Sequence, residues 1–233
     1  MNRACVLVVD DEPQMHRFLK PALEAAGYET LRADTGAEGL RLAAVRAPDA
    51  VLLDLGLPDI DGQDVLIGLR GFSAVPVIVV SARDREAEKI RALDAGADDY
   101  VEKPFGIGEL LARLRAALRH ARTRDNVPEV WQACGVIVDL ARHTVTADGA
   151  PVPLSRREYD LLALLACNAG RVMTHRQLLV AVWGPAHIED VQYLRVYIGQ
   201  IRQKLGSPGG LLISTEPGVG YRLLEAEQET PVS

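Results

Sequence analysis

Residues that could bind a metal ion and accept a phosphoryl group recur in the first half of the chain, each close to the end of a short apolar run. They are Asp10, Asp11, Asp54, Ser81 and Lys103. Carboxylate oxygens are preferred ligands of Mg²⁺, and a carboxylate can also act as the nucleophile that forms an aspartyl-phosphate. An ammonium group can neutralise an incoming phosphoryl group. The residue types therefore indicate phosphoryl chemistry on an aspartate, provided that the fold brings these side chains together.

The elements predicted around these residues would bring them together. Across residues 1–120, apolar runs alternate with helical patterns, which favours five βα units and a parallel sheet with helices on both faces. In such a sheet the carboxyl ends of the strands lie along one edge, where ligands bind. We expect strands over 4–9, 30–33, 50–53, 75–80 and 100–101, and helices over 13–26, 35–47, 62–71, 84–95 and 107–120.

Five strings carry a resemblance to a known family, and they lie at 8–12, 54–62, 81–83, 95–100 and 103–105. With them, residues 1–120 resemble the receiver domain of two-component response regulators, which has a flavodoxin-like α/β fold. The resemblance implies that a sensor histidine kinase phosphorylates the chain and that the domain binds Mg²⁺. The site residues it implies are Asp54 as phosphoacceptor, Asp11 as a direct Mg²⁺ ligand, Asp10 as a ligand through water, Asp54 and the Gly56 carbonyl as further ligands, Lys103 as the partner of the phosphoryl group, and Ser81 and Tyr100 as switch residues. The bond between Lys103 and Pro104 is expected to be cis, as in the family.

The resemblance also implies a homodimer that forms when the protein is phosphorylated. In related receivers, the fourth helix, fifth strand and fifth helix form a two-fold dimer face. The ion pairs of that face correspond here to Lys89 with Glu109, Asp99 with Arg113 and Asp94 with Arg115, and its apolar patch corresponds to Ile90, Leu93 and Ala112. Exposed ion pairs contribute only ~0–1 kcal/mol each, so the dimer is an expectation from the resemblance alone.

Two other functions use the same residues. The string Asp59-Ile60-Asp61-Gly62 resembles the nucleophile motif of aspartate-nucleophile phosphatases, although that motif should end the first strand, whereas here it lies in a loop five residues after Asp54. The second alternative is a phosphorylation-independent DNA-binding regulator with a vestigial receiver. The complete set of acids and Lys103 argues against it, because no structural requirement calls for all of them together.

The second half of the chain has a different pattern. Residues 121–128 are rich in Arg, Asp, Asn and Pro and are interpreted as a linker. We expect strands over 130–138, 143–147 and 151–154, helices over 155–168, 174–183 and 190–205, and a hairpin of 211–215 with 219–224. This α+β pattern resembles the winged helix-turn-helix domain of OmpR/PhoB regulators over 129–226, followed by a tail at 227–233.

Double-stranded DNA is the partner that this second resemblance implies. The third helix has an apolar stripe on one face and basic residues on the other, which suits the major groove. The expected DNA contacts are Thr174, Arg176, Tyr193, Arg195, Tyr197, Arg202, Lys204 and Arg222. At the wing tip the chain departs from the family pattern, because Pro217 stands where many relatives have the Arg that contacts the minor groove.

Overall charge and composition narrow the class of protein. The net charge is −6 over 233 residues, which excludes a uniformly basic nucleic-acid binder but leaves room for a local basic surface. The three cysteines, Cys5, Cys134 and Cys167, are too widely spaced to suggest a disulfide set or a metal site. We expect a cytoplasmic protein without a membrane span. RNA polymerase is a further expected partner. Longer strings, such as 73–79 and 182–185, resemble regulators of a potassium-uptake operon.

Overall fold

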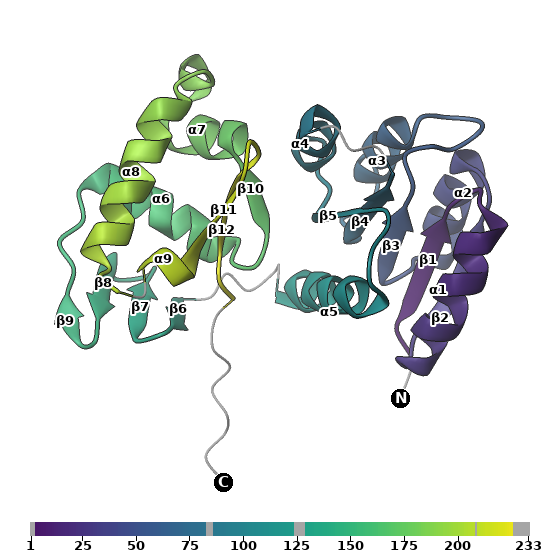
Figure 1. Ribbon diagram of the computed structural model, residues 1–233, viewed down its shortest axis with the longest axis horizontal. Coiled ribbons are helices and arrows are strands. Elements are labelled where there is room, and N and C mark those ends of the chain that lie inside the picture. The colour runs from purple at the N-terminus through teal and green to yellow at the C-terminus, as the bar shows by residue number, and fades with distance from the viewer. Residues whose placement is uncertain (1–2, 83–85, 124–128, 208, 226–233) are drawn as a thin grey trace, which may run out of the picture. The chain divides into compact units, whose positions relative to one another are not determined.

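The structure is a computed structural model that describes residues 3–82, 86–123, 129–207 and 209–225. It divides into two compact units, Met1–Arg124 and Asp125–Ser233 (Figure 1). Within the described residues, no helix is both long and apolar enough to cross a membrane.

The first unit is built on a five-stranded parallel sheet in the order β2-β1-β3-β4-β5. This confirms the predicted fold class. The strands are β1 (Cys5–Val9), β2 (Glu29–Ala33), β3 (Ala50–Leu53), β4 (Val77–Ser81) and β5 (Asp99–Glu102). The helices are α1 (Pro13–Ala25), α2 (Gly36–Arg46), α3 (Gly62–Arg70), α4 (Glu86–Asp94) and α5 (Ile107–Thr123).

Helices cover both faces of this sheet. Side chains of α1 and α5, such as Leu19 and Leu114, pack against Val8, Ile78 and Val101 in one buried cluster. On the other face, α2 packs closely enough on β1 that a Cβ at Gly39 would lie 2.9 Å from the Val9 side chain. Strands β3 and β4 are buried along their whole length, as expected for central strands of a parallel sheet.

One helix of the first unit is clearly longer than predicted. Helix α5 continues to Thr123, so residues 121–123 of the predicted linker are helical. The rest of that linker, 124–128, lies outside the described residues, as do 83–85, where the fourth helix was expected to begin, and the tail at 227–233. The sequence of α5 alternates apolar and charged residues up to Thr123 without a Gly or Pro stop signal after Gly108, which explains the longer helix.

The second unit contains two antiparallel sheets and a group of helices. The four-stranded sheet runs β6-β7-β8-β9, with β6 (Val130–Ala133), β7 (Val136–Asp139), β8 (Thr144–Ala147) and β9 (Ala150–Pro151). The three-stranded sheet runs β10-β12-β11, with β10 (Val172–Thr174), β11 (Ile213–Glu216) and β12 (Gly220–Leu223). The helices are α6 (Arg156–Cys167), α7 (His175–Trp183), the 3₁₀ helix η1 (Pro185–His187), α8 (Val191–Lys204) and the short α9 (Gly209–Leu212).

Four details of this unit differ from the sequence prediction. Of the strand predicted over 151–154, only Pro151 lies in a strand, β9. The stretch 130–138 is not one strand but two, because Cys134 and Gly135 have positive φ angles of 49° and 77° and turn the chain back. Residues 211–212, predicted as strand, belong to α9, and the hairpin begins at Ile213. Strand β10 was not predicted, and it adds a third strand beside the hairpin. The helical prediction is confirmed, since Leu194, Ile198 and Ile201 of α8 are buried in one core with Leu161 and Leu178.

Candidate functional site

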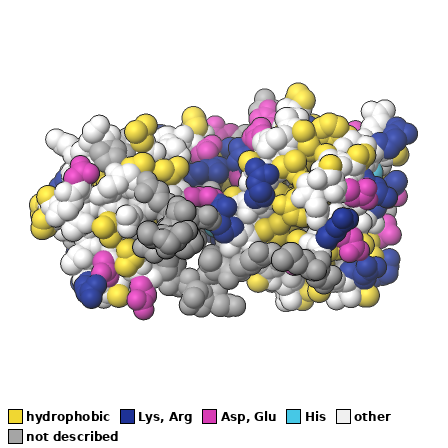
Figure 2. Space-filling view, turned by 90° about the horizontal axis from the view of Figure 1, so that it is seen from below, with side chains coloured by type: hydrophobic (Ala, Val, Ile, Leu, Met, Phe, Trp, Pro, Cys, Tyr) yellow, Lys and Arg dark blue, Asp and Glu magenta, His cyan; other side chains and the backbone are white. Residues whose placement is uncertain are grey.

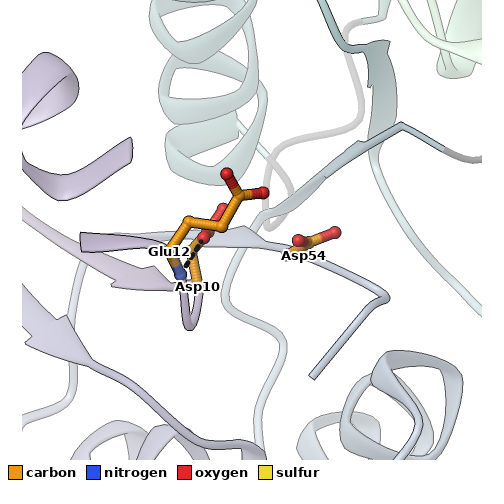
Figure 3. A group of neighbouring side chains, drawn as sticks. All are labelled: Asp10, Glu12 and Asp54. Carbon is orange, nitrogen blue, oxygen red and sulfur yellow. Dashed lines mark hydrogen bonds between the residues drawn. The ribbon is translucent and has the colours of Figure 1, made fainter. Parts of the chain in front are cut away.

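Three carboxylates gather at the carboxyl edge of the parallel sheet (Figure 3). Asp10 and Glu12 follow β1, and Asp54 follows β3; their nearest carboxylate oxygens all lie within 4.8 Å of one another. Asp10 and Asp54 are buried, whereas Glu12 is exposed. The Glu12 backbone N–H donates to Asp10 Oδ1 at 2.8 Å, which fixes that carboxylate in the turn after the strand.

Lys103 lies at the centre of the cluster. Its ammonium group donates to Asp10 Oδ2 at 2.9 Å and to Asp54 Oδ2 at 3.0 Å, and it lies 3.4 Å from Glu12 Oε1. The bond between Lys103 and Pro104 is cis, which confirms that prediction. Three carboxylates around one ammonium group leave an excess of two negative charges, and this charge and the oxygen-only donor set suit one Mg²⁺ ion.

The pKa values of Lys103 and Asp10 depend on each other, because the two groups share a hydrogen bond. Burial alone would lower the pKa of Lys103, but its hydrogen bonds to Asp10 and Asp54 outweigh that effect and raise the pKa. Burial raises the pKa of Asp10, and the hydrogen bonds from Lys103 and Glu12 offset this only in part. The buried carboxylate is thus held beside an ammonium group that stays protonated.

The cluster differs from the predicted metal ligands at one position. Asp11 is exposed, and among the described residues the third carboxylate of the cluster is that of Glu12. The sequence signal for Glu12 is its place in the run of acids 10–12, but the run alone does not tell which of two neighbouring side chains turns towards the sheet edge.

Two glycines lie beside Asp54, and one of them, Gly62, allows a close backbone approach. The Gly56 N–H donates to Asp54 Oδ1 at 3.2 Å, so Gly56 lies beside the carboxylate. The role of its carbonyl as a metal ligand stays a prediction. A Cβ at Gly62 would lie against the Asp54 carbonyl oxygen and 2.5 Å from the Leu55 Cα. The start of α3 can therefore pack directly on the strand end only because residue 62 has no side chain.

Asp59 and Asp61, the residues of the phosphatase-like string, cap helices. Asp59 accepts hydrogen bonds from the N–H groups of Gly36 (2.8 Å) and Ala37 (2.9 Å) at the start of α2, and these bonds lower its pKa. Asp61 accepts from the Gln63 N–H at 2.9 Å at the start of α3. Both carboxylates thus satisfy the free N–H groups of a helix start, which gives this string a structural explanation.

The predicted switch residues contact each other inside the fold. Ser81 ends β4, Tyr100 lies on the neighbouring β5, and both are buried. Burial raises the pKa of Tyr100, and a hydrogen bond with the Ser81 side chain partly offsets this. The Tyr100 side chain is thus buried beside Ser81 in this structure.

The predicted dimer residues lie on α4, β5 and α5, and some of them are paired within the chain. Arg113 donates to Asp99 Oδ2 at 2.8 Å and to Glu109 Oε1 at 2.9 Å. Leu93 is buried, Ile90 is half-buried, and Ala112 and Arg115 are exposed. Lys89 and Asp94 are half-buried. A dimer that uses Asp99 and Glu109 would therefore have to share or exchange the contacts that Arg113 makes in the monomer.

In the second unit, the exposed face of α8 carries only part of the predicted DNA-contact set. Tyr193 and Arg195 are exposed, and the Tyr193 side chain is among the most exposed large apolar groups at 64%. Tyr197 is half-buried, and its ring packs on that of Trp183 with 5.1 Å between centroids. Arg176 is exposed at the start of α7. Figure 2 shows basic and acidic side chains mixed on the face it presents, so bulk charge does not mark a DNA surface there.

Four residues expected to contact DNA also make contacts inside the unit, and their DNA contacts stay a prediction. Arg202 donates to the Ile213 carbonyl at 2.6 Å and to Thr215 Oγ1 at 2.8 Å, and its guanidinium lies 5.8 Å from the Tyr221 ring centre. Lys204 donates to the buried Glu158 at 2.7 Å.

The other two of these residues are Arg222 and Thr174. Arg222 donates to the Gly170 carbonyl at 3.1 Å and lies 3.3 Å from Glu216. Thr174 is fully buried and caps α7 by accepting from the Gln177 N–H. The sequence does not show whether a basic side chain bonds to other groups of its own domain. Arg202, Lys204 and Arg222 do so here.

Comparisons with known proteins agree with this geometry. A family model described as a response regulator receiver domain matches residues 6–115, and one described as the C-terminal part of transcriptional regulatory proteins matches 149–223. The chain is 51% identical to the KDP operon transcriptional regulatory protein KdpE of Escherichia coli K12, over 94% of this chain and 98% of that protein. It is 50% identical to KdpE of Mycobacterium tuberculosis H37Rv, over 93% of this chain and 97% of that protein. Among solved structures, the response regulator DrrB of Thermotoga maritima, an OmpR/PhoB homologue, matches with a TM-score of 0.51 and 28% identity, over 96% of this chain and all of that chain.

Proposed function

Because the chain belongs to the response regulators of the OmpR/PhoB type, we propose that Asp54 accepts a phosphoryl group from a partner histidine kinase in the presence of Mg²⁺. The observation that carries the proposal is the bridge that Lys103 makes between Asp10 and Asp54. It brings a nucleophile, a metal-binding carboxylate and a charge-neutralising group to one edge of the sheet.

The residues of the site support phosphoryl transfer in distinct ways. The Gly56 N–H donates a hydrogen bond to Asp54 Oδ1. The other carboxylate oxygen, Oδ2, would attack phosphorus as the bond between phosphorus and the donor breaks, and the electron pair of that bond would leave with the donor. Lys103 contacts that same Oδ2 and so lies where the transferred oxygens gain charge. Asp10, with Glu12 or Asp11, would hold Mg²⁺, and the Gly56 carbonyl would be a further ligand. The bound ion would supply positive charge to neutralise the phosphoryl oxygens.

Phosphorylation can be tested with a small phosphodonor. Incubation with acetyl phosphate and Mg²⁺ should add one phosphoryl group, measured by intact mass, and Asp54→Asn should abolish it. Asp59→Asn is the matched control, because Asp59 caps α2, and this variant should be phosphorylated like the wild type. Phosphorylation of Asp54→Asn at the wild-type level would rule out the proposal, and no phosphorylation of the wild type would favour a vestigial receiver.

The phosphoryl signal would leave the site through Ser81 and Tyr100 towards α4, β5 and α5. We expect the phosphoryl group to draw the Ser81 hydroxyl to itself and to stabilise the inward Tyr100 ring, which favours a dimer by population shift. The predicted surface comprises Lys89, Ile90, Leu93, Asp94, Asp99, Glu109, Ala112, Arg113 and Arg115. Light scattering with and without phosphorylation measures the mass, and an unchanged mass would exclude this route.

The second domain binds DNA, and we assign sequence reading to the exposed face of α8. Tyr193 and Arg195 are the principal candidates, with Tyr197 and Arg176 beside them. Phosphate contacts position a protein on DNA, whereas base contacts specify the sequence. Arg195→Ala should weaken operator binding roughly 5- to 150-fold, a loss of about 1–3 kcal/mol, whereas Arg156→Ala on α6, a similarly exposed arginine, should change it less than twofold.

The regulated genes are proposed from the relatives. Their name, KDP operon regulator in the E. coli protein, supports a potassium-transport operon as the target, and a footprint on DNA upstream of such an operon tests it.

We also propose a cytoplasmic location, RNA polymerase as a further partner, and domain limits of 1–120 for the receiver and 129–226 for the DNA-binding domain.

A further inference from the structure

A groove of about 370 Å³ lies on the receiver unit between α1 and β2, the edge strand of the sheet. The two elements lie side by side in Figure 1. Pockets that bind small molecules span roughly 300–1,000 Å³, so the groove is large enough for a small organic ligand. It belongs to neither the acid cluster nor the dimer face described above.

The lining of the groove combines an apolar wall with a cationic rim. Pro21 and Leu31 supply most of the apolar surface, and the buried side chains of Val8 and Leu19 lie beneath them. The polar lining residues are His16, Arg17, Lys20, Thr30 and Arg32, and no carboxylate is among the lining residues. A ligand that fits this lining has an apolar body and a negatively charged group.

The cations of the rim are only partly neutralised. Within the described part of the chain, Arg17 makes no ion pair. The Lys20 ammonium lies 3.8 Å from Glu24 on the surface of α1, and such an exposed pair is weak. Arg32 has a close partner, Asp34, at 2.6 Å. Arg17 and Lys20 therefore remain available to an anion, and both stand on the same helix, three residues apart, so they face the same side.

We propose that this groove binds a small organic phosphate of the nucleotide class. The phosphate group would accept hydrogen bonds from the Arg17 guanidinium and the Lys20 ammonium, in the two-pronged geometry that a guanidinium offers to phosphate. The apolar body would pack against Leu31 and Pro21. Inorganic phosphate would make the same charged contacts but would gain nothing from the apolar wall.

The binding test uses adenosine monophosphate as the probe, with the full chain in Mg²⁺-free buffer containing EDTA. We expect saturable amide shifts in NMR spectra that are centred on Arg17, Lys20, Thr30 and Arg32. The double variant with Arg17→Ala and Lys20→Ala should bind at least tenfold more weakly. Arg41→Ala is the matched control, because Arg41 is an exposed helical arginine on α2 with a weak partner at 3.9 Å, and it should bind like the wild type.

A second variant separates the groove from general charge effects. Thr30→Phe would fill the groove with a ring, keeps a residue type that favours strands, and leaves the cations in place; it should also bind at least tenfold more weakly. The proposal is overturned if the probe fails to saturate at millimolar concentration, if the shifts centre on Asp10 and Asp54, or if neither variant weakens binding. Inorganic phosphate binding as tightly as the nucleotide would overturn the role of the apolar wall.

Discussion

In each functional region, one lysine forms ion pairs with carboxylates from distant parts of the chain. Lys103 joins the ends of β1 and β3, and Lys204 joins the end of α8 to Glu158 at the start of α6. The first of these pairs could be predicted, because the resemblance places Lys103 beside Asp54. The second could not, since nothing in the sequence of α8 distinguishes a lysine that binds DNA phosphates from one that neutralises a buried glutamate.

Replacement of Lys103 should destabilise the receiver mainly when Mg²⁺ is absent. Lys103→Met leaves Asp10 and Asp54 without their shared counter-charge, which we expect to cost about 2 kcal/mol of unfolding free energy. Added Mg²⁺ should recover more stability in this variant than in the wild type. Calorimetry in EDTA and in Mg²⁺ measures both effects; Lys20→Met, at an exposed site, is the control, and an equal Mg²⁺ response in the variant and the wild type would contradict this account.

Glu158 should make the DNA-binding unit sensitive to acid. Burial alone would raise the pKa of Glu158, but hydrogen bonds from Lys204 and Ser155 outweigh burial and lower it below the ordinary value of 4.5. Since the folded state binds the proton less tightly than the unfolded chain, the stabilisation is present above pH 4.5 and is lost as the pH falls through the lower folded-state pKa. Glu158→Gln keeps the capping geometry and should flatten this part of the stability–pH curve, as measured by urea unfolding between pH 3 and 7; a curve that stays unchanged would exclude the pair as its cause.

At the scale of helices and strands, alternation of patterns was enough to predict the parallel sheet, but turns decided the details of the second unit. The pair Cys134 and Gly135 reverses the chain with positive φ angles, and this separates β6 from β7 although the apolar pattern continues across the turn. Strand β10 is only three residues long, too short for a periodic signal, and its formation depends on pairing with β12. Such pairings depend on residues distant in the sequence.

The junction between β3 and α3 should tolerate no side chain at position 62. Gly62→Ala would push a methyl group against the Asp54 backbone, and overpacking of this kind costs about 1–3 kcal/mol. We also expect slower phosphorylation, because Asp54 would move with its backbone. Gly108→Ala in α5 is the matched control, with nothing within 4 Å of the added Cβ, and it should leave stability equal or slightly higher; an equal effect of both substitutions would refute the steric explanation.

At the scale of the whole molecule, the two units have separate hydrophobic cores and should respond separately to ligands. Mg²⁺ binds only the receiver in our proposal, so it should raise the unfolding temperature of one transition and leave the other unchanged. Calorimetry of the full chain, with the transition of residues 129–233 alone as reference, measures this. A shift of both transitions by the same amount would show that the units unfold together.

The contacts of Arg202 have a consequence for how DNA would be read. Arg202 hydrogen-bonds α8 to β11 of the terminal hairpin. We therefore expect the helix and the hairpin to keep a fixed spacing when the domain binds DNA. A DNA site would then have to fit this fixed arrangement of helix and hairpin, and sequences that deform easily would fit it at a lower elastic energy. Operator preference should therefore extend to base pairs between the contacted ones, where stiffness rather than hydrogen bonding distinguishes one sequence from another.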